Sequence, residues 1–180
     1  MNYSEAYYHL MLMQVGLDDG YDAWLNTYLE KEDPLSDIVL ELSLCISDLN
    51  KTISCLKAYC SGKPVDEKTV AERLRLFLKE AYNTGRISKG EVVSAMYRLA
   101  SNHAYPYEFD TEIWGDMYYL EDYYGLAKDG IIPWDNFDRI FSAYLNEGIP
   151  LDSEKLWNAE RKPKRFSLRG LLARILSDKK

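Results

Sequence analysis

The sequence holds few side chains that could carry out acid–base, nucleophilic or metal chemistry. Its two histidines, His9 and His103, lie far apart in the chain, and its three cysteines lack the spacing of a zinc site. No phosphate-binding glycine loop, nucleophile elbow, metalloprotease helix or EF-hand loop occurs. Paired carboxylates such as Asp18 and Asp19 are frequent in acidic proteins and do not identify a general acid and base. We therefore expect a protein that is not an enzyme and needs no cofactor or metal.

The strongest candidate for a binding surface is the segment 105–138. It contains ten aromatic and nine acidic residues, and Lys128 is its single basic residue. Tyrosine offers a large contact area with one hydrogen bond, and carboxylates attract a basic partner over a distance. The composition therefore predicts an interface for a basic protein.

A helix over residues 110–126 would sort these side chains onto two faces. Its spacing predicts a core stripe of Ile113, Met117, Leu120 and Tyr124. The alternative is that some tyrosines fold inward and the acids only keep the domain soluble. The partner-binding residues that we predict are Glu108, Asp110, Glu112, Asp116, Tyr119, Asp122 and Tyr123.

The elements that position this surface are predicted to be helices throughout. Apolar residues recur at intervals of three and four, and no segment alternates as a strand does. The sequence therefore predicts an all-α, single-domain bundle of about seven to nine helices. The expected helices cover residues 4–15, 20–33, 36–59 (one long, central helix or two that break near residue 47), 66–83, 88–100, 110–126 and 133–146.

Several helix boundaries have local signals. Ser4 and Asp66 are placed to cap helices, and Ser88 with Glu91 predicts a capping box. Residues 101–110, which include His103, are expected to form an aromatic loop. In the helix over 66–83, apolar residues predict a buried face, while Arg73, Arg75, Lys79 and Glu80 are expected to face mostly water.

Charge divides the chain into two parts. Residues 1–151 hold 13 basic and 25 acidic residues, whereas residues 152–180 hold nine basic and four acidic residues. The first part is predicted to be an acidic helical body. In the second, Leu168, Leu171, Leu172, Ile175 and Leu176 predict a short amphipathic helix. We expect this helix to dock on the body; the alternatives, a membrane surface or nucleic acid, are disfavoured by the net charge of −7.

The sequence also bears on the compartment. Cys45, Cys55 and Cys60 lie on apolar helical patterns, which is typical of reduced, buried thiols. Residues 1–14 lack the basic region of a secretory signal. The longest apolar stretch, residues 38–46, is broken by Glu41 and is much shorter than the ~20 residues of a membrane helix. We expect a cytoplasmic protein without a membrane segment.

Three stretches carry a resemblance to a known family. They are residues 35–56 (LSDIVLELSLCISDLNKTISCL), 77–82 (FLKEAY) and 91–100 (EVVSAMYRLA). They resemble a bacterial all-helical domain-of-unknown-function family whose members look like immunity proteins of polymorphic toxin and contact-dependent growth inhibition systems. The resemblance implies a cytosolic inhibitor that blocks a delivered toxin domain, commonly a nuclease. It rests on core helix patterns and maps no binding residues onto this chain.

These observations lead to two hypotheses. In the first, the protein is an immunity protein, a monomer or a 1:1 heterodimer with its toxin, that covers the basic cleft of a ribonuclease or other nuclease. A strong negative field would steer it to such a cleft, where its carboxylates would take the place of phosphates. In the second, the protein is a non-catalytic regulatory or scaffolding module whose basic C-terminal segment contacts a partner or a membrane.

Overall fold

The computed structural model describes residues 1–104 and 112–152, in which all regular structure is helical. Eight α-helices lie in these ranges, as the sequence predicts. None of the helices described is long and apolar enough to cross a bilayer. The helices are α1 (Tyr3–Gln14), α2 (Tyr21–Lys31), α3 (Asp37–Cys45), α4 (Leu49–Cys60), α5 (Glu67–Asn83), α6 (Lys89–His103), α7 (Glu112–Lys128) and α8 (Trp134–Glu147).

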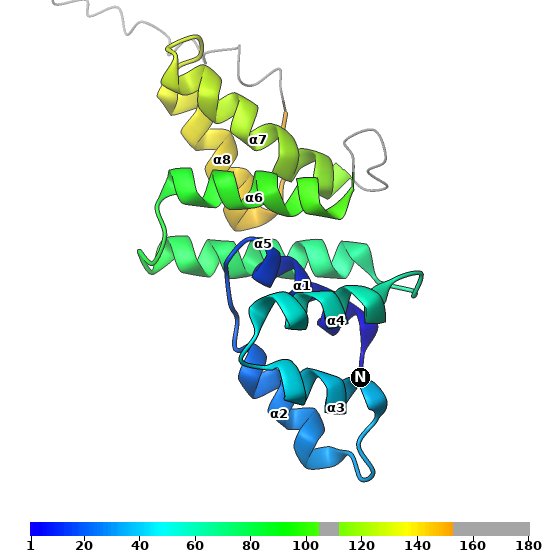
Figure 1. The fold of residues 1–180 in the computed structure, drawn as a ribbon. Helices are drawn as coiled ribbons and strands as arrows, with labels where there is room; N and C mark the ends of the chain where they lie inside the picture. Colours follow the sequence, from blue (N-terminus) through cyan, green and yellow to red (C-terminus); the bar gives the residue numbers. More distant parts are fainter. Residues whose placement is uncertain (105–111, 153–180) are drawn as a thin grey trace, which may run out of the picture.

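The helices form an elongated stack (Figure 1). The pair α7 and α8 lies at one end and the pair α2 and α3 at the other, with α5 and α6 crossing between them. Helix α1 packs against α4 on one side and against α5 and α6 on the other. The stack therefore places α7 far from α3.

Two hydrophobic clusters hold this arrangement together. The larger cluster joins α5, α6, α7 and α8, and α1 contributes Tyr8, Met11 and Leu12 to it. The smaller cluster joins α2, α3 and α4, and α1 contributes Ala6 and Leu10. Helix α1 is thus shared by both clusters, because its apolar residues surround the helix instead of forming one stripe.

Most helix starts follow the local signals in the sequence. The side chains of Asp48 and Asp66 accept hydrogen bonds from the backbone N–H of Lys51 and Thr69, and both bonds of the Ser88–Glu91 capping box are present. The predicted cap at Ser4 is wrong. Asn2 caps α1, while the Ser4 hydroxyl accepts a hydrogen bond from the Asp66 backbone N–H at 2.9 Å.

The segment 36–59 contains two helices, of which α3 is not central. Helix α3 ends at Cys45, and Asp48 starts α4. Only Val39, Leu42 and Cys45 of α3 are buried. The expected central position is wrong for α3, because this helix lies at one end of the stack, where it packs mainly against α2 and α4 (Figure 1).

Two further expectations need correction. Helix α6 continues to His103, so this residue ends a helix instead of lying in a loop. Arg75 does not face water: it is 3% exposed, for reasons given below. The rest of the expected aromatic loop and the basic segment 153–180 lie outside the described residues.

Candidate functional site

The candidate interface helix, α7, is anchored along α6. Trp114, Met117 and Leu120 recur every three residues and are fully buried in the larger cluster. Met117 and Leu120 belong to the core stripe predicted from the sequence, whereas Ile113 and Tyr124 of that stripe are half-buried. Trp114, which the prediction left out of the stripe, is fully buried, so the buried stripe is rotated slightly from the predicted one.

Rotation of this stripe decides which predicted binding residues reach the surface. The Tyr119 side chain is 47% exposed, and Asp122 is also exposed. Tyr123 and Asp116 are half-buried, and Tyr123 packs against the larger cluster. On α7, therefore, Tyr119 and Asp122 are exposed, whereas Tyr123 and Asp116 are only partly accessible.

The other three predicted residues cannot be added to this face. Glu108 and Asp110 lie outside the described residues. Glu112 is the first residue of α7, but its side chain is not among those described.

A row of phenols extends the face of α7 toward α6. The Tyr118 ring lies 5.0 Å from the Tyr97 ring of α6 and 5.4 Å from the Tyr119 ring, centroid to centroid. A hydrogen bond with Tyr97 raises the pKa of Tyr118, and burial together with nearby Asp116 and Asp122 raises the pKa of Tyr123. Both phenols therefore stay protonated at neutral pH and can donate hydrogen bonds.

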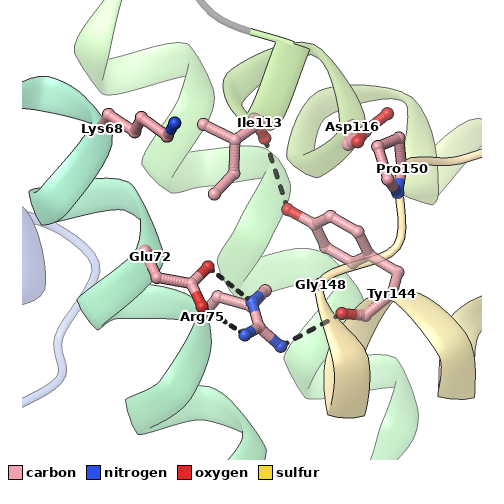
Figure 2. A pocket seen from close by; sticks show the side chains of 8 residues that line it. All are labelled: Lys68, Glu72, Arg75, Ile113, Asp116, Tyr144, Gly148 and Pro150. Atoms are coloured by element: carbon pink, nitrogen blue, oxygen red, sulfur yellow. Dashed lines mark hydrogen bonds and ion pairs between the residues drawn. The ribbon is translucent and has the colours of Figure 1, made fainter.

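A cavity of about 470 Å³ opens between α5, α7 and α8 (Figure 2). Of the predicted binding residues whose side chains are described, Asp116 lines it. The side chains of Asp116 and Lys68 stand apart from each other, and Arg75 is paired with Glu72 (Figure 2). The other lining residues are Ile113, Tyr144, Gly148 and Pro150.

Arg75, a buried lining residue of this cavity, links α5 to the C-terminal end of α8. Its guanidinium donates to the carbonyls of Tyr144, at 3.1 Å, and Leu145, and it pairs with Glu72. One turn further along α5, Lys79 donates to the Asn146 carbonyl at 2.8 Å. Carbonyls in the last turn of a helix lack intrahelical partners and carry partial negative charge. Arg75 is buried because it satisfies the C-terminal end of α8.

Polar groups at the cavity walls are also engaged within the protein. The Tyr144 hydroxyl donates to the Ile113 carbonyl at 3.3 Å, and Asp116 accepts from the Leu151 backbone N–H at 3.3 Å. Burial holds the pKa of Tyr144 well above its ordinary value. The cavity is therefore lined by charges of both signs, Lys68 and Asp116 at its opening and the paired Glu72 and Arg75, and by a neutral phenol. Such a lining can exchange hydrogen bonds with a polar side chain of a partner.

The arrangement of His103 is the constellation most similar to an enzyme site. Its Nδ1 lies 2.9 Å from the Tyr7 hydroxyl, and its Nε2 lies 3.1 Å from Glu67 Oε2. However, the His103 side chain is only 8% exposed, and it lines none of the three cavities described in this structure. Through these contacts to Tyr7 and Glu67, His103 holds α1, α5 and α6 together.

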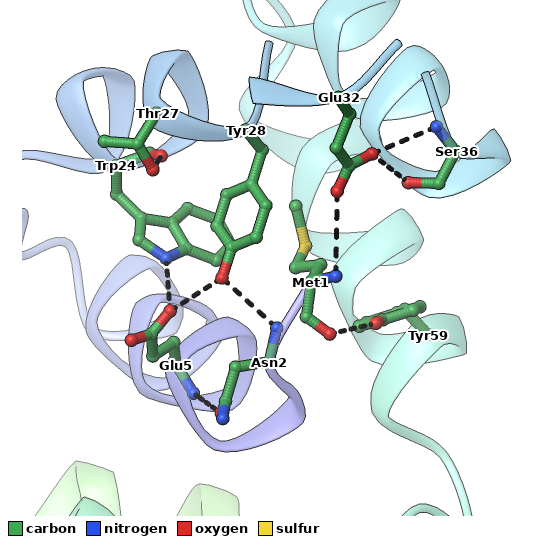
Figure 3. A network of polar contacts seen from close by, with 9 residues as sticks. All are labelled: Met1, Asn2, Glu5, Trp24, Thr27, Tyr28, Glu32, Ser36 and Tyr59. Atoms are coloured by element: carbon green, nitrogen blue, oxygen red, sulfur yellow. Dashed lines mark hydrogen bonds and ion pairs between the residues drawn. The ribbon is translucent and has the colours of Figure 1, made fainter. Parts of the chain in front are cut away.

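A second polar cluster joins α1 to α2 and α4 (Figure 3). Glu5 Oε2 accepts hydrogen bonds from Trp24 Nε1 at 3.1 Å and from the Tyr28 hydroxyl at 2.8 Å. The Tyr59 hydroxyl donates to the Met1 carbonyl at 2.7 Å. Burial opposes ionisation of Glu5, but the two donated hydrogen bonds and the Arg73 cation outweigh it, so its pKa is lowered. Glu5 is therefore an ionised anchor of the smaller cluster.

Metal ligands do not gather in the described part of the chain. In residues 1–104 and 112–152, no group of three or more His, Cys, Asp or Glu side chains is placed to hold a metal ion. Cys45 and Cys55 approach to 3.9 Å between their sulfur atoms, with Cys45 donating, and both are free thiols.

Comparison with known proteins adds no relative. Neither models of protein families, nor curated protein sequences, nor solved structures give a match to this chain.

Proposed function

We propose that this protein is an immunity protein, which neutralises a cognate toxin domain by covering that toxin's basic active-site cleft. The proposed target is a ribonuclease or another nuclease. The observation that supports this proposal most directly is the outer face of α7, where exposed Tyr119 lies beside exposed Asp122 on an acidic body.

Charge would serve the first step, the encounter. Residues 1–151 carry 25 acidic and 13 basic residues, so the surface that approaches a partner is strongly negative. A nuclease cleft must be positive to hold phosphates, and opposite fields raise association rates by one to three orders of magnitude. Asp122 and Asp116 would then occupy positions that phosphates take in the substrate complex.

Tyr119 would serve the second step, retention of the complex. A half-exposed phenol loses little conformational freedom on binding and can bury much of its ring against a partner. Its orientation is held by the edge-to-face contact with Tyr118. The cavity beside α7, about 470 Å³ in volume, is large enough to receive a long side chain of the partner, which could reach Asp116.

The test is inhibition of the toxin domain encoded in the neighbouring reading frame. An equimolar mixture should abolish nucleic-acid cleavage. The variant Asp122→Arg should slow association about tenfold at low ionic strength and should flatten its salt dependence, because a steering charge has been reversed. The matched control is Asp129→Arg, which makes the same change in net charge at an exposed position beyond the end of α7.

Retention is tested separately. Tyr119→Ala should raise the dissociation rate about tenfold or more, with association nearly unchanged. If Asp122→Arg behaves as Asp129→Arg does, and Tyr119→Ala dissociates as slowly as the parent, the outer face of α7 is not the interface.

A further inference from the structure

Two cysteines from neighbouring helices meet in the smaller hydrophobic cluster. Cys45 is the last residue of α3, and Cys55 lies in the second turn of α4. Their sulfur atoms are 3.9 Å apart, which is contact distance, and both are free thiols. Cys45 is 7% exposed, whereas Cys55 is half-buried. A small reagent can therefore reach one thiol of the pair, and the second thiol touches the first.

The turn between α3 and α4 sets this approach. The backbone N–H of Asp48 donates to the Cys45 carbonyl at 2.8 Å, which closes a turn directly after α3. The buried Thr52 hydroxyl donates to the same carbonyl at 2.9 Å and lies 3.6 Å from the Cys45 sulfur. These two hydrogen bonds hold the backbone of Cys45 against the first turns of α4. The approach of the two sulfurs therefore follows from a fixed backbone arrangement.

The third cysteine is placed differently. Cys60 also belongs to α4, but its sulfur donates toward the Tyr3 carbonyl of α1 at 3.8 Å. Side chains five residues apart on a helix point about 140° away from each other, so Cys55 and Cys60 leave α4 in different directions. Distance along the chain alone would favour pairing of Cys55 with Cys60. The fold instead brings Cys55 to Cys45.

We propose that Cys45 and Cys55 form a site of reversible oxidation, at which peroxide converts the two thiols into a disulfide that fastens α3 to α4. In the first step the Cys55 sulfur attacks one oxygen of hydrogen peroxide, the O–O bond breaks, and a sulfenic acid and one water result. In the second step the Cys45 sulfur attacks the Cys55 sulfur, and the S–O bond breaks. The hydroxide leaves with the Cys45 proton as a second water. Two thiols and one peroxide thus give one disulfide and two waters.

The surroundings of Cys55 set the conditions for this reaction. Burial, the Cys45 thiol and the Glu41 carboxylate raise the pKa of Cys55 to about 11, and the thiolate is the form that attacks an oxidant. Oxidation therefore needs sustained exposure to peroxide, and the pair stays reduced in a reducing compartment. Because Glu41 repels anions, neutral peroxide suits this site better than the anionic glutathione disulfide does.

The experiment is treatment of the folded, full-length chain with excess hydrogen peroxide. Remaining thiols are then capped in denaturant, and the protein is digested with trypsin, which separates the three cysteines by cleaving after Lys51 and Lys57. The Cys45 peptide should be joined to the Cys55 peptide, Cys60 should be capped, and dithiothreitol should reverse the link. In a control oxidised in denaturant, Cys55 should instead pair mainly with Cys60, because that loop is shorter.

Three single substitutions separate the roles of the thiols. Cys60→Ser is the matched control and should form the disulfide within about twofold of the parent rate. Cys55→Ser should form no intramolecular disulfide. Cys45→Ser lacks the second thiol and should accumulate a sulfenic acid at Cys55, which dimedone traps. The linked peptides of the parent protein identify the pair without any variant, so the test holds even if one substitution unfolds the chain.

A fastened α3 should also open less often. Its amide hydrogens should exchange about tenfold or more slowly in the oxidised protein than in the reduced protein. Three results would overturn the proposal: a Cys55–Cys60 link in the folded chain, no link between Cys45 and Cys55, or faster exchange of α3 after oxidation. The last result would show that the disulfide strains the fold. The proposal is independent of toxin binding, since it concerns α3 and α4 and not α7.

Discussion

The imidazole of His103 stacks on the indole of Trp114, with ring centroids 4.2 Å apart and planes inclined by 14°. This contact joins the last residue of α6 to the start of α7 across the residues that the structure does not describe. Together with the polar contacts to Tyr7 and Glu67, it makes His103 a junction of four helices. The orientation of α7, and with it the position of Tyr119, depends on this junction.

Replacing the junction should destabilise the protein. His103→Ala removes a buried ring stack and leaves the Tyr7 hydroxyl without its histidine partner, so we expect the free energy of unfolding to fall by about 2–3 kcal/mol. Urea denaturation followed by circular dichroism measures this change. Asn102→Ala, at the exposed neighbouring position, should change stability by less than about 0.5 kcal/mol. Equal effects of the two substitutions would contradict the role given to His103.

Arg75 should be essential for the packing of α8 on α5. Arg75→Met keeps much of the side-chain volume but removes the guanidinium that donates to the carbonyls of Leu145 and Tyr144, of which Tyr144 keeps its bond from the Gly148 backbone N–H. We expect a loss of about 2–4 kcal/mol in the free energy of unfolding, measured by thermal or urea denaturation. Arg98→Met, an equivalent change at an exposed position of α6, is the control and should be nearly neutral.

Acid should weaken the contact between α1 and α2. Burial and the nearby Arg73 cation lower the pKa of His9 from 6.5 to about 4. Between these two values the unfolded chain binds a proton that the folded protein does not, so stability is full above pH 6.5 and falls as the pH is lowered toward 4. We expect a loss of roughly 2 kcal/mol once solvent screening is allowed for.

The measurement is urea denaturation from pH 7.5 to pH 5. This range lies above the ordinary pKa values of aspartate and glutamate, so histidine titration dominates it. His9→Leu should flatten the slope of stability against pH. Gln14→Leu, a substitution of similar size on the same helix, should keep the parent slope. A parent protein with no slope in this range would show that His9 keeps its ordinary pKa.

The thiols should react slowly. Burial raises the pKa of Cys55 and of Cys60 to about 11 in each case, and the thiolate is the reactive form. We expect modification by a disulfide reagent at pH 8 to be at least about 100-fold slower in the folded protein than in denaturant. Ser61→Cys, which places a thiol at an exposed position, should add one fast-reacting group.

The parts of the fold that the sequence predicts are those with local causes. Asp66 and the pair Ser88 and Glu91 start helices through contacts within three residues, so their spacing is visible in the sequence. The buried positions of Met117 and Leu120 follow from helical periodicity in the same way. Helix number and type are therefore accessible without coordinates.

The remaining features have distant causes. Arg75 is buried because of carbonyls 69 and 70 residues away, and His103 contacts Tyr7 across 96 residues. No periodicity within α5 or α6 indicates such partners. The candidate interface could be predicted in part. Helical spacing places Tyr119 and Asp122 on the outside of α7. The partial burial of Tyr123, in contrast, depends on how α7 is rotated when Trp114 packs into the core.

The position of α1 between two hydrophobic clusters has a consequence for cooperativity. Both hydrophobic clusters include side chains of the same twelve-residue helix, α1, so neither cluster is complete without it. If α2, α3 and α4 unfolded, the side of α1 that packs against them would be exposed to water. The packing of α1 against α5 and α6 would then weaken. The molecule should consequently melt as a single unit, with one transition reported alike from both ends of the stack.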